Sequence, residues 1–162
     1  MEPSEKLIDH KNLFEYIEDR IPFIFVDKAT VIPGKSAKGI KNFSMNEEYF
    51  TAHLPGNPIV PAAFLLESMT QTAGLAIQTL YKETYGTTLF VNKYKNINVY
   101  SSVRPGDQIL IDTEILKNKR GIIESKGIVK LDTHGEQNIV CDAEFQMIMP
   151  EIFNSLLPNK EK

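Results

Sequence analysis

The sequence has very little cysteine, with Cys141 as the single thiol among 162 residues. One thiol cannot form an intrachain disulfide, so nothing indicates an oxidising compartment, and we expect a cytoplasmic protein in which Cys141 is a small strand residue. Long apolar runs are also missing. No stretch approaches the ~18 residues of a membrane span, and no charged-then-apolar leader opens the chain. We therefore expect neither a membrane span nor a disulfide-stabilised secreted domain.

A basic excess is missing as well. The chain has 18 Lys and Arg against 21 Asp and Glu, with a net charge of -3 and a pI near 5.7. Because a domain that binds phosphates normally carries a strong positive excess, nucleic acid is not expected as a partner. The short basic run of Lys117, Lys119 and Arg120 is interpreted as a solvated turn between strands, with docking of an acidic carrier as the alternative. The 42% hydrophobic content and the length suit one globular domain over residues 1–162.

Residue patterning divides the chain into a mixed first part and a strand-rich second part. Leu7, Leu13, Phe14 and Ile17 have the spacing of a short amphipathic helix within residues 1–20, which Pro22 ends. Residues 150–162 form a polar tail. The predicted strands are 23–32, 36–43, 89–100, 107–117, 121–131 and 139–149, with a helical turn at 46–50 and a long helix over 62–81.

The long helix over 62–81 is apolar nearly all round, which is typical of a helix buried on most sides. The four successive strands that follow it, joined by short turns, predict an antiparallel sheet to which the two earlier strands add. We therefore predict an α+β fold in which a curved antiparallel sheet of about six strands wraps around one central helix. Such a sheet leaves an open edge, so we also expect a homodimer.

Two polar residues interrupt this apolar helix. Glu67 and Gln71 are four residues apart and share one face. Burial of an unpaired carboxylate costs several kcal/mol or raises its pKa, and a carboxyl group that keeps its proton near neutral pH can act as a general acid. The alternative is that Glu67 faces solvent at the helix edge, paired with Gln71 or a lysine.

A rigid loop carries the second candidate group, His53. Pro55, Pro58 and Pro61 stiffen the loop, which leads directly into the helix that holds Glu67. An imidazole is available as a neutral base at cellular pH, and rigid placement is what a catalytic group needs. The other two histidines, His10 and His134, lie in polar stretches and are interpreted as solvated.

The start of the helix adds a third element. Pro61 occupies the position that proline favours at a helix start, and the backbone N–H groups of Ala62 and Ala63 after it have no intrahelical acceptor. These donors at the positive end of the helix dipole can polarise a thioester carbonyl and stabilise the enolate-like oxygen that develops there. The segment therefore supplies a base, an acid and oxyanion donors within fewer than twenty residues.

These residues stand in a longer pattern that resembles a known family. The stretch His53-Leu54-Pro55-Gly56-Asn57-Pro58-Ile59-Val60-Pro61, followed by Glu67 and Gln71, is similar to the signature of the (3R)-hydroxyacyl-acyl-carrier-protein dehydratases of fatty-acid synthesis, which have the hot-dog fold. The similarity covers roughly residues 15 to 148. It includes Arg20-Ile21-Pro22-Phe23-Ile24-Phe25-Val26-Asp27, Val103-Arg104-Pro105-Gly106-Asp107-Gln108 and Lys119-Arg120-Gly121.

The resemblance implies a role for each site residue. His53 handles the C2 proton, Glu67 assists loss of the C3 hydroxyl as water, and Gln71 helps to orient the acid. Ala62, Ala63 and Gly56 fall at oxyanion and substrate-binding positions. The two catalytic residues of one site come from different subunits of a homodimer, which can assemble further into a trimer of dimers. The substrate arrives on the phosphopantetheine arm of acyl carrier protein, with no metal or redox cofactor, and the glutamate resembles the branch that dehydrates without isomerising the double bond.

The chain also departs from the family pattern. It has Ala52-His53-Leu54 where the family usually has Gly-His-Phe, and Pro61-Ala62-Ala63 where it usually has Pro-Gly-Val. An alanine keeps its backbone N–H but its methyl limits how closely a ligand can approach, and Phe64 adds bulk near the expected acyl tunnel. Acyl chain length and pathway, housekeeping or specialised, are therefore open. A hot-dog thioesterase and a catalytically inactive acyl-binding partner subunit are the alternative functions.

Overall fold

The structure is a computed structural model and describes residues 4–133 and 135–155. Its strands are β1 (Lys6–Ile8), β2 (Lys28–Ile32), β3 (Ser36–Asn42), β4 (Phe90–Val99), β5 (Gln108–Lys119), β6 (Ile122–Thr133) and β7 (Glu136–Ile148). Its α-helices are α1 (Leu13–Tyr16), α2 (Ala62–Gln78) and α3 (Pro150–Ser155), and two short 3-10 helices are η1 (Glu48–Thr51) and η2 (Lys82–Thr84).

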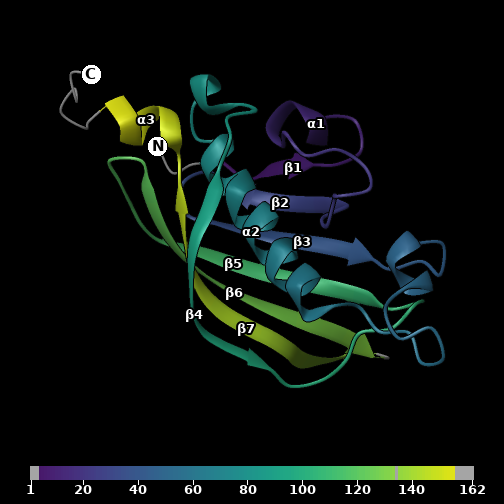
Figure 1. Ribbon diagram of the computed structural model, residues 1–162. Coiled ribbons are helices and arrows are strands. Elements are labelled where there is room, and N and C mark those ends of the chain that lie inside the picture. The colour runs from purple at the N-terminus through teal and green to yellow at the C-terminus, as the bar shows by residue number, and fades with distance from the viewer. Residues whose placement is uncertain (1–3, 134, 156–162) are drawn as a thin grey trace, which may run out of the picture.

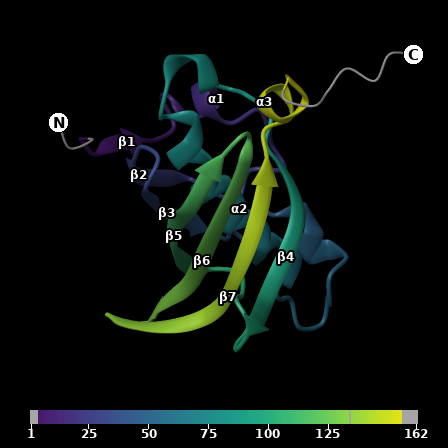
Figure 2. The ribbon, with the colours of Figure 1, turned by 90° about the vertical axis from the view of Figure 1, so that its left-hand side faces the viewer.

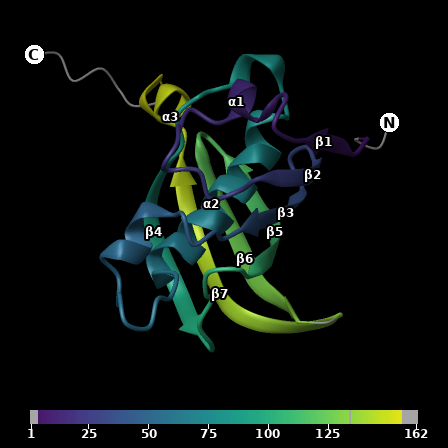
Figure 3. The same cartoon turned by 90° about the vertical axis from the view of Figure 1, so that its right-hand side faces the viewer.

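All seven strands belong to one antiparallel sheet with the order β1-β2-β3-β5-β6-β7-β4. The sheet curves around α2, which lies across its concave face (Figure 1). Views from two opposite sides show the sheet in front of α2 in Figure 2 and α2 in front of the sheet in Figure 3. The predicted α+β architecture is confirmed, with seven strands in place of about six.

The helix α2 packs closely against the sheet at two glycines that face it. A Cβ atom on Gly39 of β3 would lie 2.6 Å from the Thr72 Oγ1 atom, and one on Gly127 of β6 would lie 2.8 Å from the Met69 sulfur. From Ser68 onward every residue of α2 is buried. The all-round apolar pattern of this helix therefore reflects contact with the sheet on one side and with the N-terminal region on the other.

The N-terminal region differs from the predicted amphipathic helix. Lys6–Ile8 form β1, paired with Ala29–Val31 of β2, and only the four residues of α1 are helical. The prediction is therefore wrong for Leu7, whose side chain is exposed in a strand, and for Phe14, whose side chain is exposed on α1. Leu13, Tyr16 and Ile17 are buried as a helical face would place them. At the other end of the chain, α3 occupies the first six residues of the predicted polar tail, and residues 156–162 lie outside the described residues.

The strand β4 lies at one end of the sheet order and pairs with β7 on its inner side. Several large apolar side chains on and next to this strand are exposed: Phe90, Ile97, Val99 and Tyr100. An apolar strand edge of this kind is a natural place for a second subunit. The dimer remains a prediction.

Several smaller predictions can be placed in the fold. Cys141 is buried in β7, which confirms that it is a strand residue, and the His10 side chain is 82% exposed. His134 lies outside the described residues. Lys117 and Lys119 end β5, and Arg120 lies in the turn to β6. None of the helices in the described ranges is long and apolar enough to cross a membrane.

Candidate active site

The loop of residues 53–61, called the His53 loop below, fixes the imidazole by one short contact. The His53 Nδ1 atom lies 3.0 Å from the Ile59 carbonyl oxygen, and the His53 backbone N–H donates to the Tyr49 carbonyl oxygen at 2.7 Å. A carbonyl oxygen only accepts hydrogen bonds, so Nδ1 carries the ring proton in the neutral imidazole. Nε2 then has a free lone pair, and this is the tautomer that a general base needs.

The far side of the His53 loop is fastened to the segment that precedes β5. The Val60 N–H donates to the Val103 carbonyl oxygen at 2.8 Å, and the Arg104 Nη1 atom donates to the Asn57 Oδ1 atom at 2.6 Å and to the Pro58 carbonyl oxygen at 3.4 Å. The loop is therefore held by contacts from its beginning to its end. This agrees with the rigidity predicted from its prolines.

Glu67 and Gln71 share one face of α2, as their spacing predicts. The Gln71 Nε2 atom donates to the Glu67 Oε1 atom at 2.9 Å and to the Phe23 carbonyl oxygen at 2.9 Å, while its Oε1 atom accepts from the Phe25 N–H at 2.8 Å. The Gln71 side chain is buried and uses both ends of its amide. It orients the Glu67 carboxyl group and fastens the Phe23–Phe25 segment to the helix.

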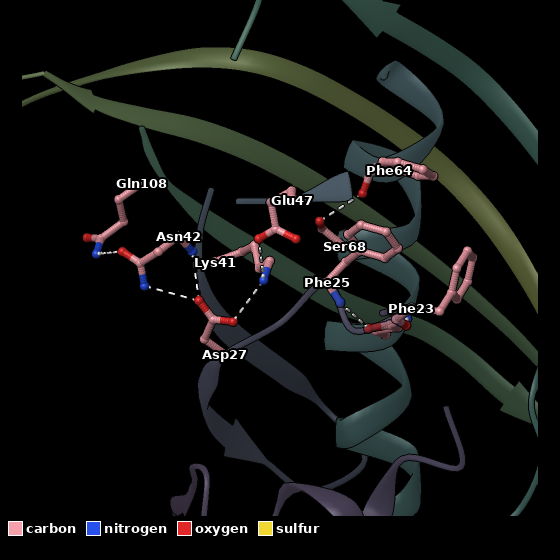
Figure 4. A network of polar contacts seen from close by, with 10 residues as sticks. Phe23, Phe25, Asp27, Lys41, Asn42, Glu47, Phe64, Ser68 and Gln108 are labelled. Carbon is pink, nitrogen blue, oxygen red and sulfur yellow. Dashed lines mark hydrogen bonds and ion pairs between the residues drawn. The ribbon is translucent and has the colours of Figure 1, made fainter. Parts of the chain in front are cut away.

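The same segment is anchored farther along by Asp27 (Figure 4). Its carboxylate accepts from the Lys41 Nζ atom at 3.1 Å and from the Asn42 backbone N–H at 2.8 Å. Lys41 also lies 3.7 Å from a Glu47 oxygen, and the Gln108 side chain donates to the Asn42 side chain at 2.7 Å. These contacts hold the segment against β3 and the start of η1, so its position beside α2 is fixed.

Glu67 borders a cavity of about 430 Å³ between α2, the segment after α1 and the start of β4. Burial raises the pKa of the Glu67 carboxyl group, and the nearby Asp19 carboxylate raises it further, whereas hydrogen bonds from Gln71 and Thr70 oppose the shift. Glu18 and Asp19 also line the cavity, and no lysine, arginine or histidine does so among the described residues. The surroundings therefore favour the neutral, proton-carrying form of Glu67.

His53 does not line the cavity that Glu67 borders. No hydrogen bond or ion pair joins the two side chains within the part of the chain that the structure describes. A single chain therefore presents the two groups separately, although only thirteen residues lie between them.

The start of α2 has the free donors that its sequence predicts. Pro61 is the N-cap, and in the described part of the chain no side chain caps this end of the helix. Ala62 and Ala63 are both exposed, so their N–H groups can reach a ligand. Gly56 is also exposed, and a Cβ atom there would meet no atom within 4 Å. The roles predicted for these three residues remain predictions.

Phe64 packs into an aromatic cluster instead of the cavity beside Glu67. Its ring stacks on Phe25 with centroids 4.5 Å apart and meets Tyr49 edge-on at 4.8 Å. Figure 4 shows its position next to Phe25 and Phe23. Its place in an acyl tunnel remains a prediction, because a tunnel shared with a second subunit would have walls other than those of this cavity.

Three residues near Glu67 were not predicted from the sequence. Thr70 donates to the Glu67 Oε2 atom at 3.2 Å. Asp19, in the segment after α1, lines the same cavity and raises the pKa of Glu67, and Tyr94, on β4, is near enough for the charge of Glu67 to raise its own pKa. Thr70 could have been found, because it lies three residues from Glu67 on a helix. Asp19 and Tyr94 carry no local signal, since the fold alone brings them to the site. No group of three or more metal-ligating side chains is present in the described ranges.

Comparisons with known sequences concern the family of the chain. Residues 18–144 match the family model described as a FabA-like domain. The 3-hydroxyacyl-(acyl-carrier-protein) dehydratase FabZ of Bacillus licheniformis is 33% identical over 146 residues, which covers 90% of this chain and 98% of that protein. The protein of the same name from Caldicellulosiruptor saccharolyticus is 37% identical over 140 residues, which covers 85% of this chain and 96% of that protein.

Comparisons with solved structures concern the fold. The dehydratase heterocomplex ApeI:P from Xenorhabdus doucetiae matches with a TM-score of 0.69 and 12% identity, and the match covers 91% of each chain. A hypothetical thioesterase with coenzyme A from Streptococcus pneumoniae matches with a TM-score of 0.52 and 17% identity, covering 72% of this chain and 79% of that one. At these identities the likeness shows a shared fold, which dehydratases and thioesterases both use.

Proposed function

Because the chain belongs to the FabA-like family, we propose that it dehydrates a (3R)-3-hydroxyacyl thioester on acyl carrier protein to the trans-2-enoyl thioester. The chain is then a hydro-lyase that acts in fatty-acid synthesis or in a specialised pathway built on the same chemistry. The observation that carries the proposal is the contrast between its two polar groups. His53 is held with a free Nε2 lone pair, and Glu67 is held where burial raises the pKa of its carboxyl group.

In the proposed reaction the base acts next to a polarised thioester. The Nε2 atom of His53 removes a proton from C2, and the electron pair of that C–H bond forms the new C2–C3 double bond. The N–H groups of Ala62 and Ala63 at the start of α2 bind the thioester oxygen while negative charge develops on it. The tautomer set by the Ile59 carbonyl is the one required for this step.

The acid completes the elimination. Glu67 gives its proton to the C3 hydroxyl as the C3–O bond breaks, so that the group leaves as water and not as hydroxide. Glu67 becomes a carboxylate and His53 an imidazolium, and a net proton transfer between them through solvent restores the resting forms. The site needs no metal or redox cofactor for this chemistry, and the substrate arrives on the phosphopantetheine arm of the carrier.

The complete site is proposed to form between two subunits. His53 lies outside the cavity that Glu67 borders, so a substrate at Glu67 of one subunit would meet His53 of the partner subunit. The exposed apolar edge at β4, which forms one wall of that cavity, supports a homodimer that buries this edge, alone or within a trimer of dimers.

The first test measures the reverse reaction, hydration of a 2-enoyl carrier-protein substrate, by loss of enoyl absorbance. His53→Ala and Glu67→Gln are each expected to abolish it, and His10→Ala is the control at an exposed histidine. Full activity in either site variant would refute the assigned mechanism. Release of free thiol without enoyl chemistry would indicate a thioesterase. A chain that is inert alone but increases the activity of a related dehydratase would indicate a partner subunit.

The second test asks whether the site spans two subunits. His53→Ala and Glu67→Gln proteins are unfolded together, refolded as a mixture and assayed against each protein refolded alone. Half of the random dimers are mixed, and each mixed dimer has one of its two sites intact, so about a quarter of wild-type activity should return. No recovery, with mixed dimers demonstrated by mass spectrometry, would show that both groups act from one chain.

A further inference from the structure

The Glu67 carboxyl group has a separate partner for each of its two oxygens. Gln71 donates an amide N–H to Oε1 at 2.9 Å, and the Thr70 hydroxyl lies 3.2 Å from Oε2. An amide N–H does not accept a hydrogen bond, so the acidic proton of Glu67 resides on Oε2, the oxygen beside Thr70. We infer that Thr70 and Tyr94 are positioning residues that hold Oε2 of Glu67 for proton donation to the leaving hydroxyl. This inference rests on the proposed acid role of Glu67.

Thr70 can partner both protonation states of Glu67. Its Oγ1 atom lies 3.0 Å from the Glu67 backbone carbonyl oxygen and 3.2 Å from Oε2. While Glu67 is neutral, the threonine proton bonds the backbone carbonyl, and its oxygen can accept the proton on Oε2. After Glu67 has given up that proton, the threonine hydroxyl turns to donate to the new carboxylate. A hydrogen bond to the charged form lowers the cost of proton donation.

Tyr94 supports Thr70 from the neighbouring edge strand. It lies in β4 opposite Phe145 of β7, with ring centroids 6.1 Å apart, and its phenol is near enough to Thr70 and Glu67 for both groups to affect its pKa. Burial, followed by the charge of Glu67, raises the pKa of Tyr94 to about 12. A hydrogen bond with Thr70 opposes this shift. In the proposed arrangement the protonated phenol donates to the Thr70 oxygen, so that the threonine proton is available to the Glu67 carboxylate.

The other described groups around Glu67 do not stabilise the negative charge of its carboxylate. Asp19 and Glu18 face the cavity from the segment after α1, and Glu18 accepts a hydrogen bond from Thr88. Burial and the charge of Glu18 raise the pKa of Asp19. No cation lines the cavity among the described residues, so the carboxylate formed after proton donation relies on Gln71 and on Thr70.

The test compares Thr70→Val, Thr70→Ser and Tyr94→Phe in the dehydration assay across pH. The matched controls are Ser68→Ala, which removes a hydroxyl on the same helix bonded to the Phe64 carbonyl (Figure 4), and Tyr85→Phe, which removes a phenol on a ring that packs against Tyr16. Thr70→Val should lower kcat about tenfold, because one hydrogen bond to a charged group is lost, with KM within about twofold. Thr70→Ser should recover most of the rate, and Tyr94→Phe should lower it about threefold.

A direct titration separates positioning from packing. In protein with a ¹³C-labelled glutamate carboxyl, the Glu67 signal is assigned by its loss in Glu67→Gln. Its pKa should rise in Thr70→Val and in Tyr94→Phe, because both changes weaken support for the carboxylate, and it should not move in the two controls. The high-pH limb of the dehydration profile should shift in the same direction.

The inference would be overturned if Thr70→Val and Tyr94→Phe matched the controls in kcat and in the Glu67 titration, or if Thr70→Ser were as impaired as Thr70→Val. Tyr94→Phe removes only one oxygen, so it decides the question if Thr70→Val does not fold. Failure of the proposed function has a different signature. Dehydration that survives in Glu67→Gln would refute the acid role of Glu67, whatever the Thr70 variants do.

Discussion

Replacement of Gln71 by methionine should lower the free energy of unfolding more than the replacement of any other polar side chain near the site. Methionine has nearly the same length and volume, so the change removes hydrogen bonds with little loss of packing. Gln71 serves the Phe25 N–H, the Phe23 carbonyl oxygen and the Glu67 carboxyl oxygen, and it does so from a position that is only 6% exposed. All three partners lose their bond at once.

The magnitude follows from where these partners lie. Phe25 is buried, so its N–H would be left without water and carries the full penalty of about 1 to 3 kcal/mol. Phe23 and Glu67 have partial access to solvent, and each should contribute about 0.5 to 1 kcal/mol. The expected loss is therefore about 3 kcal/mol, which for a chain of this size lowers the melting temperature by about 6 to 12 °C.

The assay is chemical and thermal unfolding at one fixed protein concentration, since dimer formation would couple stability to concentration. Gln108→Met is the matched control: Gln108 is exposed and bonds only one side chain, that of Asn42, so a loss within about 0.5 kcal/mol is expected. A loss of less than 1 kcal/mol in Gln71→Met would refute the reasoning, because the amide would then not be what fastens the Phe23–Phe25 segment to the helix.

Four further changes have definite expected outcomes. Because the pKa of Glu67 is raised in the folded state, its contribution to stability is lost as pH rises through that pKa. The melting temperature of Glu67→Gln, measured relative to that of wild type, should therefore increase from acidic to alkaline buffer. Gly39→Ala should lower the free energy of unfolding by about 1 to 3 kcal/mol, since its Cβ atom would lie 2.6 Å from a helix hydroxyl. Gly56→Ala should leave thermal stability within about 0.5 kcal/mol and raise KM if substrate passes there, as steady-state kinetics will show. Arg104→Ala should lower kcat several-fold while unfolding changes by less than about 1 kcal/mol, because it frees the exposed side of the His53 loop.

The elements that have their own periodic pattern could be predicted from the sequence. The helix α2 begins at Ala62 as Pro61 indicates, and it ends three residues earlier than predicted because the last turn tightens, with the Leu80 N–H bonded to the Ile77 carbonyl. The four long strands were placed to within about three residues. The closeness of Glu67 and Gln71 follows from helical spacing alone, so the sequence predicts it as well.

Elements that depend on distant partners could not be predicted in this way. β1 has three residues and exists through its pairing with β2, which no local pattern reveals. Residues 23–27 were predicted as strand, but Phe23 and Phe25 bond the Gln71 side chain, and backbone bonding to β3 begins only at Asp27. Tyr94 reaches Glu67 only because β4 crosses to the outside of β7, and the sequence alone does not contain that crossing.

That crossing also sets the order in which the molecule can be completed during synthesis. The ribosome makes α2 and then β4, but Phe90 of β4 pairs with Ile148 of β7, so β4 has no neighbour until the last strand emerges. Throughout that interval the apolar helix is only partly covered, and this is the stage at which chaperones would bind and at which aggregation competes. The same dependence means that a chain ending before β7 would contain Glu67, Thr70, Gln71 and Tyr94. It would still lack the strand that holds β4, and with it Tyr94, beside Glu67. The residues of the candidate site are therefore synthesised before β7, but the site is complete only after β7 has formed.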